Sequence, residues 1–124
     1  MQELGGLLPW QIKRVRGYLD DRLDGRIRMA SVAEQARLSP SYFSRRFRQC
    51  FGVTFAKFIA RMRVERAQRL MMTSPLSLSH IALACGFADQ AHFTRTFSAL
   101  TGSTPAQWRR EALLSASEAR WRKH

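Results

Sequence analysis

The stretch CGFADQAHFTRTF, residues 85–97, carries side chains that can exchange hydrogen bonds with a polar partner. Phe93 and Phe97 are four residues apart, so they lie on one side of a helix. The other side carries Gln90, Ala91, Thr94 and Arg95. Arginine can donate two hydrogen bonds to guanine, glutamine can pair with adenine, and the threonine methyl can meet the thymine methyl. This face is therefore a candidate for reading base edges.

The same pattern occurs earlier in the chain. VAEQARLSPSYFSRRFRQCFGVTFAKF begins at residue 32, and IALACGFADQAHFTRTFSALTGSTPAQW begins at residue 81. After one residue of slippage, the matched pairs are Phe43 and Phe93, Arg45 and Arg95, Phe47 and Phe97, Gly52 and Gly102, and Thr54 and Thr104. We interpret these segments as two copies of one structural unit.

Each copy reads as a short helix, a tight turn and a longer helix, which is the helix-turn-helix pattern. A helical hairpin used only for packing would also contain a turn and small residues, but the basic excess and the polar faces favour DNA binding. We expect base contacts from residues on the two longer helices: Ser41, Ser44, Arg45, Gln90, Ala91, Thr94 and Arg95. Arg45 and Arg95 are favoured because they recur at equivalent places. The alternative for each position is an ordinary solvated helix face.

Contacts to the DNA backbone need less geometry than base contacts. The short helices near Ser31 and Ser79 could offer backbone N–H groups to phosphates. The full set of expected backbone contacts is Ser31, Arg46, Arg48, Lys57, Arg61, Ser79, Asp89 and Ser98. The arginine run from Arg61 to Arg69 could equally contact an acidic protein.

Charge restricts the class of partner. The 124 residues carry a formal net charge of +12, nearly all of it from arginine. Such a chain favours nucleic acid, an acidic membrane surface or an acidic protein as its partner. Cys50 and Cys85 are the only cysteines and form no CxxC pair, so we expect no metal and no cofactor. The absence of a membrane-spanning apolar run or a secretory leader predicts a cytoplasmic protein without membrane contact.

The hydrophobic periodicity predicts an all-α fold of seven helices. Capping signals place short-helix and long-helix starts at Ser31 (the S-x-x-E box with Glu34), Ser39 and Thr104, and helix ends at Gly52 and Gly102. The predicted helices cover about 10–24, 31–36, 41–51, 55–72, 78–84, 89–100 and 105–114.

The fourth predicted helix would link the two units. From Phe55 to Met72 it would be roughly 27 Å long at 1.5 Å per residue. Successive major-groove entries on one face of B-DNA are about 34–36 Å apart. A rigid spacer of this kind would place two reading helices of one chain in successive grooves of an asymmetric site, and shorter spacing would bend the duplex towards the protein.

With these residues identified, the chain resembles the DNA-binding domain of AraC/XylS-type transcription regulators. The segment Ile81–Arg109, IALACGFADQAHFTRTFSALTGSTPAQWR, is similar to the family signature almost throughout, and Met29 to Phe58 is similar to its first helix-turn-helix. The resemblance implies seven helices, with two helix-turn-helix units joined by one long helix. It also implies sequence-specific binding of double-stranded promoter DNA, often as an activator that contacts RNA polymerase.

The resemblance also predicts the domain organisation. Residues 1–8 are expected to be an N-terminal tail or linker remnant, residues 9–114 the DNA-binding domain, and residues 115–124 a basic C-terminal tail. The first helix-turn-helix would cover about 31–51, the linker helix about 55–72 and the second helix-turn-helix about 78–100. Many relatives carry a separate effector or dimerisation domain, so we expect either a short regulator or a fragment of a longer one.

Three residues depart from the family pattern. Arg37 stands in the first turn where Gly86 stands in the second, and a positive φ there would cost about 1–2 kcal/mol. Ala88 replaces a commonly polar residue, which makes Asp89 the expected helix cap. Ala91 is too short to read a base by hydrogen bonding, so specificity there would rest on a methyl contact or on its neighbours.

Three rival functions stay open at this point. The first is a nonspecific nucleic-acid binder that uses charge alone, and the second is a protein-interaction module without DNA binding. The third is an enzyme, for which Cys85, Asp89 and His92 are the only tempting cluster. On a helix, Cys85 and His92 would lie on opposite sides of a turn, and no group supplies an oxyanion hole, so we expect no catalysis.

Overall fold

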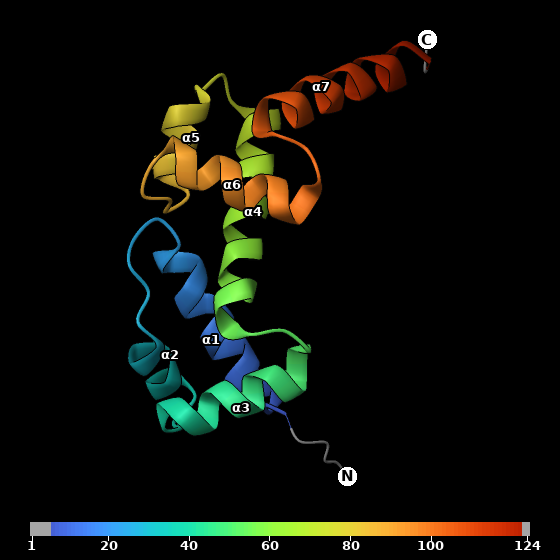
Figure 1. Cartoon of the computed structure of the whole chain (residues 1–124). Coiled ribbons are helices and arrows are strands. Elements are labelled where there is room, and N and C mark those ends of the chain that lie inside the picture. The colour runs from blue at the N-terminus through green and yellow to red at the C-terminus, as the bar shows by residue number, and fades with distance from the viewer. Residues whose placement is uncertain (1–5, 123–124) are drawn as a thin grey trace. The chain divides into compact units, whose positions relative to one another are not determined.

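The computed structural model describes residues 6–122 and confirms the all-α prediction (Figure 1). Its seven helices are α1 (Pro9–Arg22), α2 (Met29–Gln35), α3 (Pro40–Phe51), α4 (Phe55–Thr73), α5 (Leu78–Ala84), α6 (Gln90–Thr101) and α7 (Pro105–Arg122). The chain divides into two compact units after Met62, inside α4. Residues 1–5 of the expected N-terminal tail and 123–124 of the expected basic tail lie outside the described residues.

The ends of the two longer helices follow their capping chemistry. The Ser39 side chain accepts a hydrogen bond from the backbone N–H of Tyr42 at the start of α3, and Asp89 accepts one from His92 at the start of α6. A cap of this kind satisfies one of the four unpaired N–H groups at a helix start. Gly52 and Gly102 end the same helices with left-handed φ values of 74° and 82°. These caps were predicted from the sequence.

Two predicted helix boundaries are wrong. Ser31 does not cap α2, because the helix begins at Met29 after an extended Arg28, and the Ser31 N–H donates to the Arg28 carbonyl at 3.1 Å. Met29 packs against the first core, which explains the earlier start. The last helix continues to Arg122 instead of ending near Leu114. Helix-favouring residues and an exposed Glu118–Arg122 pair at 4.0 Å support this extension, although few of its side chains are buried.

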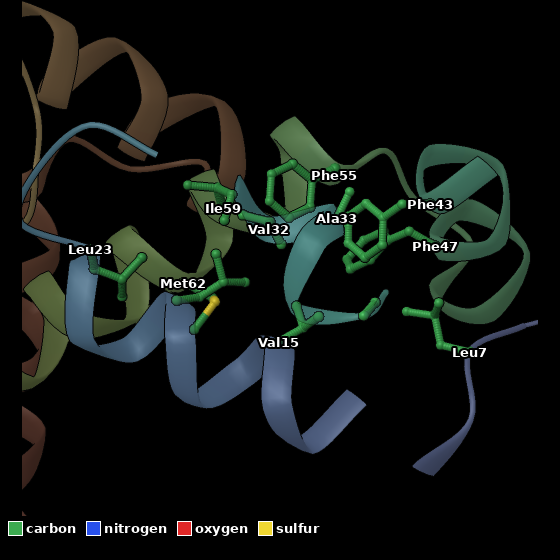
Figure 2. Close-up of a cluster of buried hydrophobic side chains, with 12 residues drawn as sticks. Leu7, Val15, Leu23, Val32, Ala33, Phe43, Phe47, Phe55, Ile59 and Met62 are labelled. Atoms are coloured by element: carbon green, nitrogen blue, oxygen red, sulfur yellow. The ribbon is translucent and has the colours of Figure 1, made fainter. Parts of the chain in front are cut away.

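The first unit is built around a phenylalanine cluster (Figure 2). Phe43 and Phe47 of α3 are 0% and 1% exposed, and both rings meet Phe55 of α4 edge-on, with centroids 5.6 and 5.3 Å apart. The other members of this core are Leu7, Val15, Leu19, Leu23, Val32, Ala33, Ala36, Ile59 and Met62. Each buried large side chain contributes about 1.5–3 kcal/mol, so this cluster determines which face of α3 remains outside. Leu7, expected in a tail, is part of it.

The second unit repeats this arrangement. Phe93 and Phe97 of α6 are both fully buried, and the Phe97 ring meets Trp108 of α7 edge-on at 6.0 Å. The rest of the core comes from the second half of α4 and from the segment around α5: Val64, Ala67, Met71, Ile81, Ala82, Cys85 and Phe87. The phenylalanines of α3 and α6 therefore have the same role in both units.

The turns between the short and long helices are also equivalent. In the first turn the Leu38 N–H donates to the Ala33 carbonyl, and in the second Phe87 donates to Ala82, each at 3.0 Å. Both turns contain a residue with positive φ: Arg37 at 58° and Gly86 at 87°. The strain anticipated at Arg37 is therefore present. Because the spacing up to Leu38 and Phe87 is identical, the one-residue slip between the copies falls after the turn, at Ala88.

Candidate nucleic-acid interface

The outer face of α3 carries the residues expected to read bases in the first unit. Ser41, Ser44, Arg45 and Arg48 are exposed, and the opposite face is anchored by Phe43 and Phe47. The face is therefore held in a fixed orientation by the core of its own unit. Two short hydroxyls are followed along it by two long guanidinium groups, so both base edges and phosphates are chemically suitable ligands.

Tyr42 organises the arginines of this face. Its hydroxyl accepts a hydrogen bond from Arg46 Nη2 at 2.5 Å, and the guanidinium carbon of Arg46 lies 4.9 Å from the ring centroid. The Arg45 guanidinium lies 5.5 Å from the same centroid. Gln49 completes a shallow hollow with these three residues. Tyr42 was not predicted as a site residue, although an aromatic residue three and four positions before two arginines is a signal for such contacts.

The outer face of α6 carries the corresponding residues of the second unit. Gln90, Ala91 and Arg95 are exposed, whereas Thr94 is half-buried. Ser79 of α5 donates a hydrogen bond from Oγ to Oε1 of Gln90 at 2.7 Å. This bond fixes the glutamine side chain at the start of α6 and directs its amide NH2 group towards other acceptors.

The second face lacks a counterpart of the tyrosine. His92 occupies the position equivalent to Tyr42, its ring packs edge-on against Phe87 at 5.3 Å, and its Nδ1 accepts from the Ala88 N–H at 3.4 Å. Within residues 6–122, the Arg95 side chain makes no hydrogen bond, ion pair or ring contact. The two repeated arginines therefore differ: Arg45 is placed beside an aromatic ring, and Arg95 is held only by its backbone.

The expected backbone contacts are of three kinds. Arg48, Lys57 and Arg61 are exposed cations, and Arg46 is half-buried against Tyr42. Ser31 is the third residue of α2, and its N–H donates to the Arg28 carbonyl. Ser79 is the second residue of α5, which Ser77 caps by accepting from the His80 N–H at 3.3 Å. The remaining two positions support α6 itself.

Asp89 and Ser98 are occupied within their own helix. The Asp89 carboxylate accepts from the His92 N–H at 2.7 Å, and the half-buried Ser98 accepts through its carbonyl from the Gly102 N–H at 2.9 Å. A carboxylate repels phosphate, so helix capping is the role that the geometry of Asp89 supports.

Cys85 is a core residue and not a nucleophile. Its side chain is fully buried, and burial raises the pKa of its thiol, opposed by the positive charges of Arg66, Arg69 and Arg63. Desolvation also lowers the pKa of Arg63 from its ordinary value. A thiol kept protonated by burial is inert. Among the described residues, no three His, Cys, Asp or Glu side chains are grouped so that they could hold a metal ion.

Arg109 is a structural residue that sequence reasoning did not single out. Its guanidinium donates three hydrogen bonds to backbone carbonyls, to Met71 at 3.1 Å, Ser74 at 2.7 Å and Leu76 at 2.8 Å. These carbonyls belong to the end of α4 and to the segment after it, where a carbonyl has no N–H partner within the helix. Arg109 therefore fixes the path of the chain into α5.

Comparison with known proteins identifies the family. A family model described as a helix-turn-helix domain matches residues 32–111. The chain is 32% identical over 100 residues to the arabinose operon regulatory protein of Escherichia coli (strain K12), and the matched segment covers 80% of this chain and 34% of that protein. It is 33% identical over 91 residues to the HTH-type transcriptional activator RhaR of Salmonella dublin, covering 73% and 32%. The chain spans about a third of the length of the curated relatives it matches.

Solved structures agree with this assignment. The C-terminal domain of AraT from Geobacillus stearothermophilus matches with a TM-score of 0.76 and 31% identity, over 85% of this chain and 87% of that one. The DNA-binding domain of AdpA, solved in complex with a target DNA, matches with a TM-score of 0.74 and 31% identity, over 90% and 95%. No helix within residues 6–122 has the length and apolar character needed to cross a membrane.

These relatives are transcription regulators, which confirms the prediction that the chain is not an enzyme. The duplicated unit, the exposed faces of α3 and α6 and the residues matched by the family model point to one assignment. The chain belongs to the AraC/XylS-type family of helix-turn-helix transcription regulators and represents its DNA-binding domain.

Proposed function

We propose that the chain is a sequence-specific regulator that activates transcription by reading promoter DNA with α3 and α6. One observation carries the proposal: Arg45 and Arg95 are both exposed on helices whose opposite faces are anchored by equivalent phenylalanine pairs. An arginine on a helix anchored in this way can donate two hydrogen bonds to O6 and N7 of guanine. Ser41, Ser44, Gln90, Ala91 and Thr94 would contact neighbouring base edges.

The proposed mode of binding uses one chain on an asymmetric site. α4 has 19 residues, which corresponds to about 28 Å at 1.5 Å per residue. A spacer of this length suits two reading helices in successive major grooves, with the duplex bent towards the protein where the grooves are further apart. Arg46, Arg48, Lys57 and Arg61 would neutralise phosphates and hold the register.

Partners beyond DNA follow from the family. An activator of this kind would contact RNA polymerase in the cytoplasm, and an effector or dimerisation domain in the whole protein would control when it binds. The basic α7, to which no DNA contact is assigned, offers one surface for such contacts.

The decisive experiment compares two arginine variants on two kinds of DNA. A preferred duplex is first selected from a random pool, and its affinity is then compared with that of a scrambled duplex at two salt concentrations. Arg45→Ala or Arg95→Ala should lose roughly 1–3 kcal/mol on the preferred duplex and discriminate less between the two. Arg120→Ala, which removes one exposed charge from α7, is the matched control. Equal losses on both duplexes in all three variants would identify a nonspecific binder.

A further inference from the structure

The first unit contains a second surface that base reading does not use. One face of α1 forms a shallow groove of about 690 Å³, completed by Gln35 of α2. Its residues recur three and four positions apart, as on one helical face: Trp10, Lys13, Arg14, Gly17, Tyr18, Asp21 and Arg22. The opposite side of α1 is buried through Gln11, Val15 and Leu19. The groove therefore belongs to the outward face of a well-anchored helix.

Gly17 lies in the middle of this face, and no contact within its own chain requires a glycine at this position. It is exposed in the interior of α1, and a Cβ built on it meets no atom within 4 Å. Its φ is not in the left-handed region, so backbone conformation does not require glycine either. Glycine in a helix interior lowers helix stability relative to alanine. A glycine that is unfavourable for its own helix is accounted for when another backbone packs closely against it.

The side chains around Gly17 indicate the chemistry of that other backbone. The Trp10 ring is 45% exposed, and Tyr18 presents a ring that Arg22 covers at 3.9 Å from the centroid. Lys13 and Arg14 add two exposed cations, and the only hydrogen bond from the Arg14 guanidinium that the structure describes is a long one, 3.4 Å to Gln35. Aromatic surface beside unpaired cations suits a ligand with apolar and acidic side chains.

The distribution of charge favours a polypeptide over DNA. Of the charged groove residues, Lys13, Arg14 and Arg22 are cations and Asp21 is an anion, and the exposed Asp24 follows just beyond α1. A DNA backbone is anionic along its whole length, so it would meet repulsion at this end. A protein helix, in contrast, can carry acidic side chains only at the end that faces the groove cations and none at the end that faces Asp21. We infer that the α1 groove binds an acidic amphipathic helix of a protein partner, packed over Gly17.

The test uses a defined peptide probe and the intact chain. A labelled peptide of about 18 residues, with leucines on one helical face and glutamates on the other, is titrated at about 150 mM salt. A scrambled peptide of identical composition controls for general attraction to a chain of net charge +12. The amphipathic peptide should bind at least about tenfold more tightly than the scrambled one.

The variant Gly17→Leu distinguishes peptide binding in this groove from peptide binding driven by net charge alone. The substitution changes no charge and fills space that no atom of the chain occupies, so the variant should fold at least as well as the wild type. It should weaken peptide binding at least about tenfold, whereas Ala119→Leu at an exposed position of α7 should not. Lys13→Glu combined with Arg14→Glu provides a second variant with the same expected loss.

DNA binding is measured in parallel on the selected duplex. Affinity for that duplex should change less than about twofold in Gly17→Leu, since no groove residue belongs to α3 or α6. Peptide binding that is equal in wild type and Gly17→Leu would overturn the proposal. A loss of affinity for every duplex in both groove variants would also overturn it, because the groove would then be a phosphate contact. If the duplex titrations of the arginine variants showed no base reading, the comparison of peptide binding between wild type and Gly17→Leu would still test the groove.

Discussion

The hydroxyl of Tyr42 and the guanidinium of Arg46 are joined by a hydrogen bond of 2.5 Å across one turn of α3. The same ring lies 5.5 Å from the Arg45 guanidinium, so one exposed aromatic side chain organises two cations. Ordering these long side chains before DNA arrives reduces the rotamer entropy that binding must overcome. α6 has no such device, because His92 faces Phe87 instead.

Tyr42→Phe should weaken binding to the preferred duplex by about 0.5–1.5 kcal/mol, the usual net contribution of one hydrogen bond. The ring remains, so the position of Arg45 should change little. Duplex titrations of Tyr42→Phe, Arg46→Ala and the double variant measure the coupling directly. Additive losses would show that the hydroxyl does not act through Arg46. Thermal unfolding serves as the control, because Tyr42 is exposed and its hydroxyl is outside the core.

Lys57→Ala should reduce the slope of log affinity against log salt by about one unit and weaken all sequences alike. Lys57 is exposed near the start of α4 and carries no base-reading group. The measurement is a salt series on the preferred and the scrambled duplex. An unchanged slope, or a loss confined to the preferred duplex, would remove Lys57 from the phosphate contacts. Arg120→Ala again supplies a variant with the same change in net charge.

Arg109→Lys should lower the free energy of unfolding by about 2–4 kcal/mol, because an ammonium cannot reach three diverging carbonyls in the plane of a guanidinium. Those acceptors are Met71, Ser74 and Leu76. Urea unfolding followed by circular dichroism checks this value. Arg110→Lys, at an exposed neighbouring position, should be near neutral. Equal stability of both variants would show that the carbonyls are satisfied by other groups.

These residues also show which parts of the fold can be predicted from sequence. The caps at Ser39, Asp89, Gly52 and Gly102 were predictable because each satisfies groups within its own turn. The anchoring phenylalanines were predictable because their spacing matches the helical period. The exposed positions of Arg45 and Arg95 follow from the same spacing.

Contacts between distant segments were not predictable in this way. Arg109 meets carbonyls 33–38 residues away, and Gln11 donates to the Ala36 carbonyl 25 residues away while accepting from the Leu8 N–H. No local pattern encodes such partners. The early start of α2 likewise depends on the burial of Met29 in the first core, which overrides the capping box suggested at Ser31.

Cys85 should make folding less favourable at high pH. Its thiol has a pKa raised above the ordinary value of 9.0, chiefly by burial. Its contribution to stability is fully present below pH 9.0 and is lost as pH rises from there through the folded-state pKa, because the unfolded chain releases the proton first. Urea unfolding of wild type and Cys85→Ala across this range isolates the effect. Parallel curves for the two proteins would exclude a contribution from the thiol.

Arg37→Gly should raise the free energy of unfolding by up to about 1 kcal/mol. A non-glycine residue at φ 58° is strained by about 1–2 kcal/mol, and glycine removes that strain at some cost in unfolded-state entropy. The substitution also removes a guanidinium 6.0 Å from the Trp10 ring, which is a weak contact at that distance. Thermal and urea unfolding provide the value. A clear destabilisation would mean that the arginine side chain outweighs the strain.

The two copies of the helix-turn-helix unit match at some positions and differ at others. The anchoring phenylalanines and the terminal glycines are the same in both, but the tyrosine of α3 corresponds to a histidine in α6, and a serine cap corresponds to an aspartate. The inner side of each unit is therefore a shared scaffold, whereas several residues of the outer side differ between the two units. A variant with substitutions in the outer face of one unit could therefore acquire a new recognition sequence while the unchanged unit still binds its original half of the site.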